Sequence, residues 1–159
     1  MPTLIFVHGA CVRDAAWWWS KMTKPLADRG IATAVVPLSS CGEASEKLGD
    51  LYDDVDSCRR AIAAVDGPVV LCGHSYGGVI ITEAGGDDRV TQLLYVTSVM
   101  PDEDLATPAE TQRRRVRAGA GLVEFDSGHH PFLSRPTRSR TPRSCARSGY
   151  STARTSRSR

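Results

Sequence analysis

The sequence predicts an α/β fold in which a parallel β-sheet carries helices on both faces. Apolar runs typical of strands alternate along the chain with stretches compatible with helices. The strand-like runs are continuously apolar, which is typical of strands buried on both faces. One intervening stretch has a clear helical period. In sheets of this kind, active sites lie beyond the carboxyl ends of the strands.

Four segments are predicted as strands because each is short and rich in apolar residues. They comprise residues 3–7, 31–38, 69–72 and 92–99. Parallel strands all end at the same edge of their sheet. The turn after the first strand and the turn after the third should therefore lie on one rim.

Three segments between these runs are predicted as helices. Residues 17–30 place apolar side chains on one stripe and end at Gly30. Residues 50–65 carry apolar side chains every three or four positions, with aspartates in the first turn, where the helix dipole favours negative charge. A third helix is predicted from about residue 79. Residues 39–49 are polar and are predicted as a loop.

Composition limits the class of protein. A chain of 159 residues suits one domain with a sizeable core, and its 41% hydrophobic and 24% charged residues are typical of a globular protein. No apolar run is long enough to cross a membrane, and no secretory signal is recognised at the start. Five cysteines without CxxC spacing argue against a disulfide framework or a zinc site. We therefore expect a cytoplasmic protein without a metal or organic cofactor.

The charge divides the chain into two parts. Residues 1–130 carry a net charge of −6, whereas residues 131–159 contain eight arginines and no acid. The second part is also rich in Ser and Thr and lacks an apolar repeat, which predicts a disordered basic tail after a folded domain at 1–130. The abrupt change favours a shift of reading frame near Phe132. The alternative is a basic arm that contacts nucleic-acid phosphates, although the tail lacks the interleaved aromatic residues of single-strand binders.

The strongest chemical signal is the sequence Gly73-His74-Ser75-Tyr76-Gly77, which matches the G-x-S-x-G nucleophile elbow. It lies between a predicted strand and a predicted helix. Such a turn holds the serine in a strained backbone conformation and projects its hydroxyl over the sheet rim. The amide of Tyr76 opens the next helix and can donate to a developing oxyanion. Ser75 is therefore the candidate nucleophile, the alternative being a bystander serine in a tight turn.

The turn after the first predicted strand, His8-Gly9-Ala10, supplies a second candidate donor. An oxyanion hole needs two amides, one after the serine and one from the loop after an earlier strand. The Ala10 amide is the candidate for the second position, and an ordinary strand-end turn is the alternative. His8 is expected to be a hydrogen-bonded loop residue, and His74 to pack away from the serine.

Three consecutive tryptophans at 17–19 allow two interpretations. They could line an acyl pocket, but tryptophans at the start of a helix more often anchor the core, and we favour that interpretation.

These motifs resemble the α/β-hydrolase superfamily. The resemblance rests on residues 6–11 (FVHGAC), 73–78 (GHSYGG) and 94–101 (LYVTSVMP), and it extends over about residues 3–104. The methylesterases and hydroxynitrile lyases are the branch that these residues resemble. The resemblance implies Ser75 as nucleophile, the Ala10 and Tyr76 amides as oxyanion hole, and a cap that begins within residues 101–130. It leaves open whether the chemistry is that of a hydrolase or a lyase.

The sequence departs from the family after the fourth predicted strand. The resemblance implies an acid and a histidine that follow two further strands, but the basic tail stands in their place. The remaining candidates are Asp102 as the acid and His129 or His130 as the base, although nothing in the sequence holds them over Ser75. The fold class predicted is thus an incomplete α/β-hydrolase fold.

The expected function is ester hydrolysis by a serine nucleophile, weak or lost because the acid and base are missing. The expected partner is a small-molecule ester, with no membrane and no nucleic acid. Self-association through an unpaired sheet edge is also expected. The alternative function is a non-enzymatic binding protein, with a pocket that binds without turnover or a tail that contacts nucleic acid.

Overall fold

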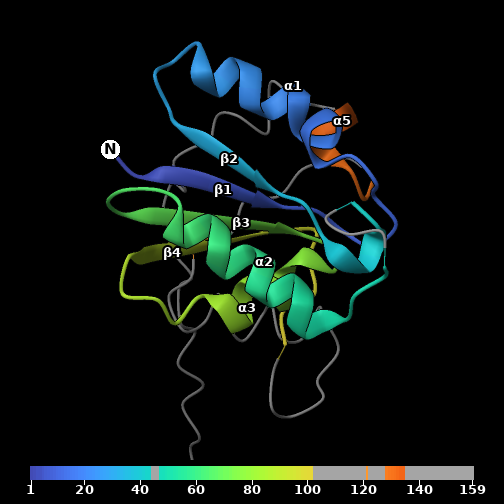
Figure 1. Cartoon of the computed structure of the whole chain (residues 1–159). Helices are drawn as coiled ribbons and strands as arrows, with labels where there is room; N and C mark the ends of the chain where they lie inside the picture. Colours follow the sequence, from blue (N-terminus) through green and yellow to red (C-terminus); the bar gives the residue numbers. More distant parts are fainter. Residues whose placement is uncertain (44–46, 102–120, 122–127, 135–159) are drawn as a thin grey trace, which may run out of the picture.

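The computed structural model describes residues 1–43, 47–101, 121 and 128–134 and confirms the α/β class. Four parallel strands form one sheet in the order β2-β1-β3-β4 (Figure 1). The strands are β1 (Thr3–Val7), β2 (Thr33–Val36), β3 (Val69–His74) and β4 (Val90–Val96). The order places β3, which precedes the Ser75 turn, between β1 and β4.

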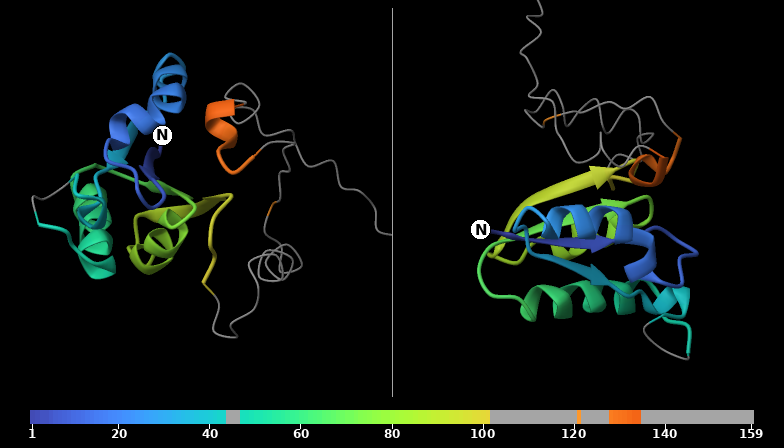
Figure 2. Two further views of the ribbon diagram at one scale, coloured as in Figure 1. Left: turned by 90° about the vertical axis from the view of Figure 1, so that its right-hand side faces the viewer. Right: turned by 90° about the horizontal axis from the view of Figure 1, so that it is seen from above.

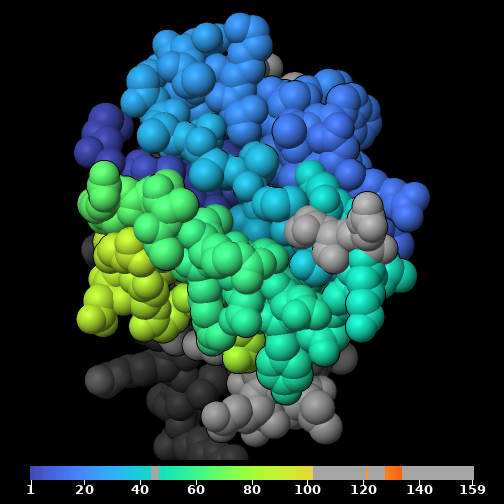
Figure 3. Space-filling view, in the orientation of Figure 1, coloured from blue at the N-terminus to red at the C-terminus, as the bar shows by residue number. Residues whose placement is uncertain are grey.

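Helices cover both faces of the sheet (Figure 2). On one face lie α1 (Ala15–Ala27) and the short α5 (Pro131–Ser134), and on the other α2 (Leu51–Ala63) and α3 (Gly77–Ala84). The segment after β2, predicted as a loop, contains the single 3₁₀ turn η1 (Ser39–Cys41). Figure 3 shows the side chains of α2 across the front of the sheet, with α1 above them.

Side-chain caps set the starts of the two longer helices. The Asp14 carboxylate accepts a 2.7 Å hydrogen bond from the Trp17 amide, so α1 begins two residues before the predicted position. Asp50, predicted within the first turn of this helix, is instead the N-terminal cap of α2. Its side chain accepts from the Asp53 amide and the Asp53 side chain accepts from the Asp50 amide, which completes a capping box.

The alternation of side chains along β1 separates two hydrophobic layers. Ile5 and Val7 face α2 and α3, where the core includes Val55, Cys58, Ile62, Ile80 and Ile81. Phe6 faces α1 and packs with Trp19, Met22, Leu26, Cys72 and Phe132. The Trp19 ring stacks on Phe6 with centroids 4.6 Å apart and is fully buried, whereas Trp17 is 65% exposed. Trp19 thus anchors the core, as the favoured interpretation predicted.

The first four residues of the predicted tail are described by the structure and pack against the sheet. Pro131–Ser134 form α5, and the Phe132 side chain is 1% exposed within the layer beneath α1. A single large aromatic side chain buries enough apolar surface to hold this short segment on the sheet. The remainder of the predicted tail, 135–159, lies outside the described residues, as do most of the predicted cap and Asp102.

The fourth strand ends earlier than the sequence predicts. It closes at Val96, because Thr97 adopts a left-handed backbone conformation with φ of 43° that cannot continue a strand. Within the part of the chain that is described, no helix has the length and apolar character needed to cross a bilayer.

Candidate active site

Ser75 occupies a sharp turn between β3 and α3. Its φ of 53° lies in the left-handed region, which non-glycine residues seldom adopt and which costs free energy. The strand ends one residue before it, and Tyr76 is the N-terminal cap of α3. The strand–turn–helix context that the G-x-S-x-G motif requires is therefore present.

Close backbone approach explains the glycines around this turn. A Cβ on Gly73 would stand 2.6 Å from the Gly77 carbonyl oxygen, and a Cβ on Gly77 would stand 2.5 Å from the Val7 carbonyl oxygen. A Cβ on Gly9 would lie 2.9 Å from Cβ of Ser75. Real Cβ atoms do not approach so closely, so the loop after β1 reaches Ser75 only because Gly9 lacks a side chain.

The segment after β4 supports the turn from the other side. The Ser75 carbonyl accepts hydrogen bonds from the Ser98 hydroxyl at 2.7 Å and from the Val99 amide at 3.1 Å. The Ser75 amide donates to the Val96 carbonyl at 3.4 Å. The role of Ser98 was not predictable from the sequence, because nothing local marks a serine that bonds to backbone 23 residues away.

The loop that carries Ala10 is held by His8 and Glu43. His8 is fully buried, and its Nδ1 donates to the Gly9 carbonyl at 2.7 Å, as expected of a hydrogen-bonded loop histidine. Its Nε2 lies 3.4 Å from Oε2 of Glu43, and the other oxygen of Glu43 accepts from the Ala15 amide at 2.9 Å. Glu43 therefore holds the Ala15 end of the segment that contains Ala10 by a hydrogen bond, and it lies close to His8 at the other end. This role was not predictable from the sequence, because Glu43 lies in a polar segment predicted as an ordinary loop.

The residue after the candidate nucleophile is anchored to α2. The Tyr76 hydroxyl donates a 3.0 Å hydrogen bond to Oδ2 of Asp54, whose carboxylate is fully buried and also accepts from the Ser40 amide. Burial, together with the Asp54 carboxylate, raises the pKa of Tyr76 well above its ordinary value. The phenol thus stays protonated and keeps donating, which fixes the position of the Tyr76 backbone.

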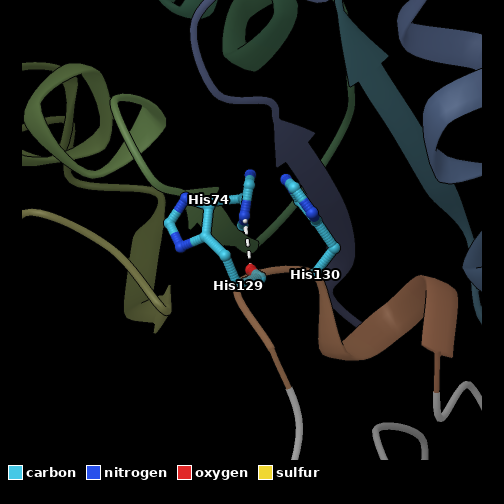
Figure 4. Close-up of side chains that lie close together, drawn as sticks. All are labelled: His74, His129 and His130. Atoms are coloured by element: carbon cyan, nitrogen blue, oxygen red, sulfur yellow. Dashed lines mark hydrogen bonds between the residues drawn. The ribbon is translucent and has the colours of Figure 1, made fainter.

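His74 lies between His129 and His130 (Figure 4). Its Nε2 donates to the His129 carbonyl at 2.9 Å, and its ring is 1% exposed. Burial, only partly opposed by this hydrogen bond, lowers the pKa of His74 to about 4, so the ring is neutral at pH 7. His74 packs against the aromatic rings of Trp18, Trp19 and Phe132, in keeping with the packing role expected for it.

The structure brings the two candidate bases to His74. The His129 ring centroid lies 4.7 Å from that of His74, and the His130 centroid lies 5.1 Å from it. Within the described residues, the Ser75 hydroxyl makes no hydrogen bond to either ring. With the candidate acid, Asp102, outside these residues, the described part of the chain presents a strained serine close to the loop after β1 and no assembled triad.

Comparison with known proteins agrees with this architecture. A model of the alpha/beta hydrolase family matches residues 4–110. Methylesterase 8 from Arabidopsis thaliana is 31% identical over 105 residues, which are 62% of this chain and 38% of the relative. Polyneuridine aldehyde esterase from Rauvolfia serpentina is 29% identical over 105 residues, which are 62% of this chain and 39% of the relative.

Solved structures show the same likeness. A crystal structure of polyneuridine aldehyde esterase superposes with a TM-score of 0.58 and 26% identity, over 72% of this chain and 48% of that one. A pyrethroid hydrolase from Sphingobium faniae superposes with a TM-score of 0.53 and 26% identity, over 62% of this chain and 40% of that one. The chain thus spans about two fifths of the length of the curated relatives named above. Because the family model covers more than half of it, the chain belongs to the alpha/beta hydrolase family.

Proposed function

We propose that Ser75 is the nucleophile of an ester-hydrolysing site that is weak or inactive in this chain, and that its substrate class is a small-molecule acyl ester. The observation that carries the proposal is the φ of 53° at Ser75, held between β3 and α3. Backbone strain of this kind is retained where the surrounding structure enforces it, as it does at nucleophile elbows. The esterase relatives support the substrate class.

In this proposal, the Ser75 hydroxyl attacks the ester carbonyl and the alcohol leaves. The Tyr76 and Ala10 amides donate to the oxyanion of the tetrahedral intermediate. The Tyr76 hydroxyl donates to Asp54, which supports the segment that carries the Tyr76 amide. The Ala15 amide donates to Glu43, which supports the segment that carries the Ala10 amide.

The weakness follows from the missing base. A serine hydroxyl stays protonated at neutral pH unless a neighbouring group accepts its proton, and the described residues supply no hydrogen-bonded base. Loss of triad members typically lowers turnover by about 10⁴- to 10⁶-fold. Hydrolysis of the acyl-enzyme also needs a base to activate water, so an acylated serine should persist.

Covalent labelling tests the proposal directly. A fluorophosphonate should modify Ser75 slowly, as located by peptide mass mapping, and turnover of p-nitrophenyl acetate should be close to background. Ser75→Ala should abolish labelling, whereas Ser20→Ala, at an exposed serine on α1, should not change it. Labelling elsewhere, or none at all in the folded protein, would reject Ser75 as nucleophile. Ligand binding without labelling would favour the non-enzymatic alternative.

A double substitution tests whether the two histidines act as bases. If His129→Ala with His130→Ala removed a robust Ser75-dependent turnover while the protein remained folded, the site would be competent and the proposed weakness would be wrong. Unchanged low turnover in the double variant is the expected result.

A further inference from the structure

We propose that His74, His129 and His130 form a binding site for a divalent transition-metal ion such as Zn²⁺. This inference goes beyond the proposed ester chemistry and does not depend on it. It rests on the arrangement of the three rings, on the state of the His74 ring nitrogens, and on the contacts that hold the three residues together.

The three rings are close enough to share one ion. One nitrogen from each lies within 4.8 Å of the others, and the ring centroids are 4.7 to 5.1 Å apart. Nitrogen ligands of tetrahedral zinc at about 2.0–2.1 Å stand roughly 3.4 Å from one another. Small side-chain rotations would therefore close the site. His129 is exposed and can rotate, and His130 is not fully buried although its ring packs edge-on against Trp18, whereas His74 is fixed in the core.

The hydrogen bonding of His74 identifies its ligand atom. A carbonyl can only accept, so the 2.9 Å contact with the His129 carbonyl places the proton on Nε2 and leaves the lone pair on Nδ1. Nδ1 is buried and has no hydrogen-bond partner. Gly9 leaves space beside it, since a Cβ there would approach Nδ1 to 3.1 Å. Histidines that bind metals commonly donate their second ring N–H to a backbone carbonyl in this manner.

Two anchors hold the segment of His129 and His130 against His74. The Thr97 hydroxyl donates to the His129 carbonyl at 2.7 Å. On the other side, the buried Phe132 ring packs against Trp19 with centroids 4.5 Å apart, and it also touches the His74 ring edge-on. The backbone between the two rings and the segment that follows them are therefore tied to the sheet. This reduces the conformational entropy that metal binding would otherwise remove.

The ligand set defines the class of ion. Three imidazoles without a carboxylate suit zinc, copper, nickel or cobalt, and do not suit magnesium or calcium, which prefer oxygen ligands. Three protein ligands leave a fourth tetrahedral position open.

Calorimetric titration of the full chain with Zn²⁺ tests the proposal. The protein should carry no affinity-tag histidines and should be treated with EDTA beforehand. We expect one ion per chain and a higher Tm with saturating Zn²⁺, because an ion that binds only the folded state stabilises it. His129→Ala and His130→Ala should each weaken binding at least tenfold, and the double variant should abolish it.

A matched control separates this site from adventitious binding. Cys11 is an exposed thiol that could itself bind zinc, so Cys11→Ser should leave the affinity unchanged. The Co²⁺ form should show visible absorption of a nitrogen-ligated ion without thiolate charge transfer. His74→Gln should also abolish binding. If that variant does not fold, the double variant at the exposed histidines decides alone. Absence of stoichiometric binding, or binding that survives the double substitution, would overturn the proposal.

Discussion

The hydroxyl of Tyr76 donates a 3.0 Å hydrogen bond to the buried carboxylate of Asp54, which joins α2 to the turn that carries Ser75. The same carboxylate accepts from the Ser40 amide at 3.0 Å. The turn after β3, the 3₁₀ turn η1 and the helix α2 are therefore joined through the Asp54 carboxylate. A buried carboxylate destabilises the folded state unless hydrogen-bond donors satisfy it. Loss of the Tyr76 hydroxyl should therefore lower the free energy of unfolding.

Tyr76→Phe should lower the free energy of unfolding by about 1–3 kcal/mol, because it leaves Oδ2 of Asp54 without its donor. Equilibrium denaturation in urea measures the change. Tyr52→Phe is the matched control, since Tyr52 lies on α2 with Asp54 but its side chain is 80% exposed. An equal effect of the two substitutions would show that the hydrogen bond to Asp54 contributes nothing.

Gly9→Ala should reduce fluorophosphonate labelling of Ser75 by at least tenfold. The new methyl group would stand 2.9 Å from Cβ of Ser75 and would force the loop with the Ala10 amide away from the turn. A shift of about 1 Å in a catalytic group can cost 10²-fold in rate.

The control for Gly9→Ala is Gly86→Ala, at a position where an added Cβ meets nothing within 4 Å. This variant should label like the parent protein. Labelling of Gly9→Ala at the parental rate, with the fold intact, would show that the β1 loop takes no part in the reactivity of Ser75.

The sequence allowed most of the fold to be predicted because its signals are local. Continuous apolar runs mark the strands, and a regular apolar period with Asp50 at its start marks α2. Element ends were less predictable, since they depend on individual caps and dihedral angles such as those at Asp14 and Thr97. The α5 segment was missed because one aromatic residue, Phe132, creates no periodicity in an arginine-rich stretch.

The site was only partly predictable, again because sequence signals are local whereas most of its contacts are not. The motif around Ser75 is contiguous and requires a particular turn, so its geometry follows from a few residues. The supporting contacts of Asp54, Glu43 and Ser98 join residues 22 to 28 positions apart. The three-histidine cluster likewise spans 55 positions between His74 and His129. No local pattern encodes these pairings, which depend on the tertiary fold.

The buried thiols should resist alkylation in the folded protein. Burial raises the pKa of both Cys58 and Cys72 to about 12, so their reactive thiolate forms are scarce at pH 8. Iodoacetamide at pH 8, followed by peptide mass mapping, should modify the exposed Cys11 and leave these two unmodified. In guanidinium chloride all three should react. Rapid modification of Cys72 without denaturant would contradict its burial.

The same shifts predict a loss of stability in alkali. Because the folded-state pKa values of Cys58 and Cys72 lie above the ordinary value of 9.0, the folded protein holds more protons than the unfolded chain above that pH. Their contribution to stability is complete below pH 9 and falls as the pH rises from 9 towards 12. Urea midpoints at pH 8 and pH 10.5 test this. Cys72→Ala should show a smaller decrease between the two pH values than the parent.

Phe132→Ala should destabilise the folded chain by about 3–4 kcal/mol, the usual cost of truncating a buried aromatic side chain. The cost arises because Phe132 fills the layer beneath α1, in contact with Trp18 and Trp19. Trp17→Ala is the control, because it removes a still larger ring from the same region but from a side chain that is 65% exposed. It should lower the free energy of unfolding by less than about 1 kcal/mol. Urea denaturation compares the two variants. If both variants cost the same, α5 would not belong to the folded core, and His129 and His130 would lose the anchor that holds them against His74.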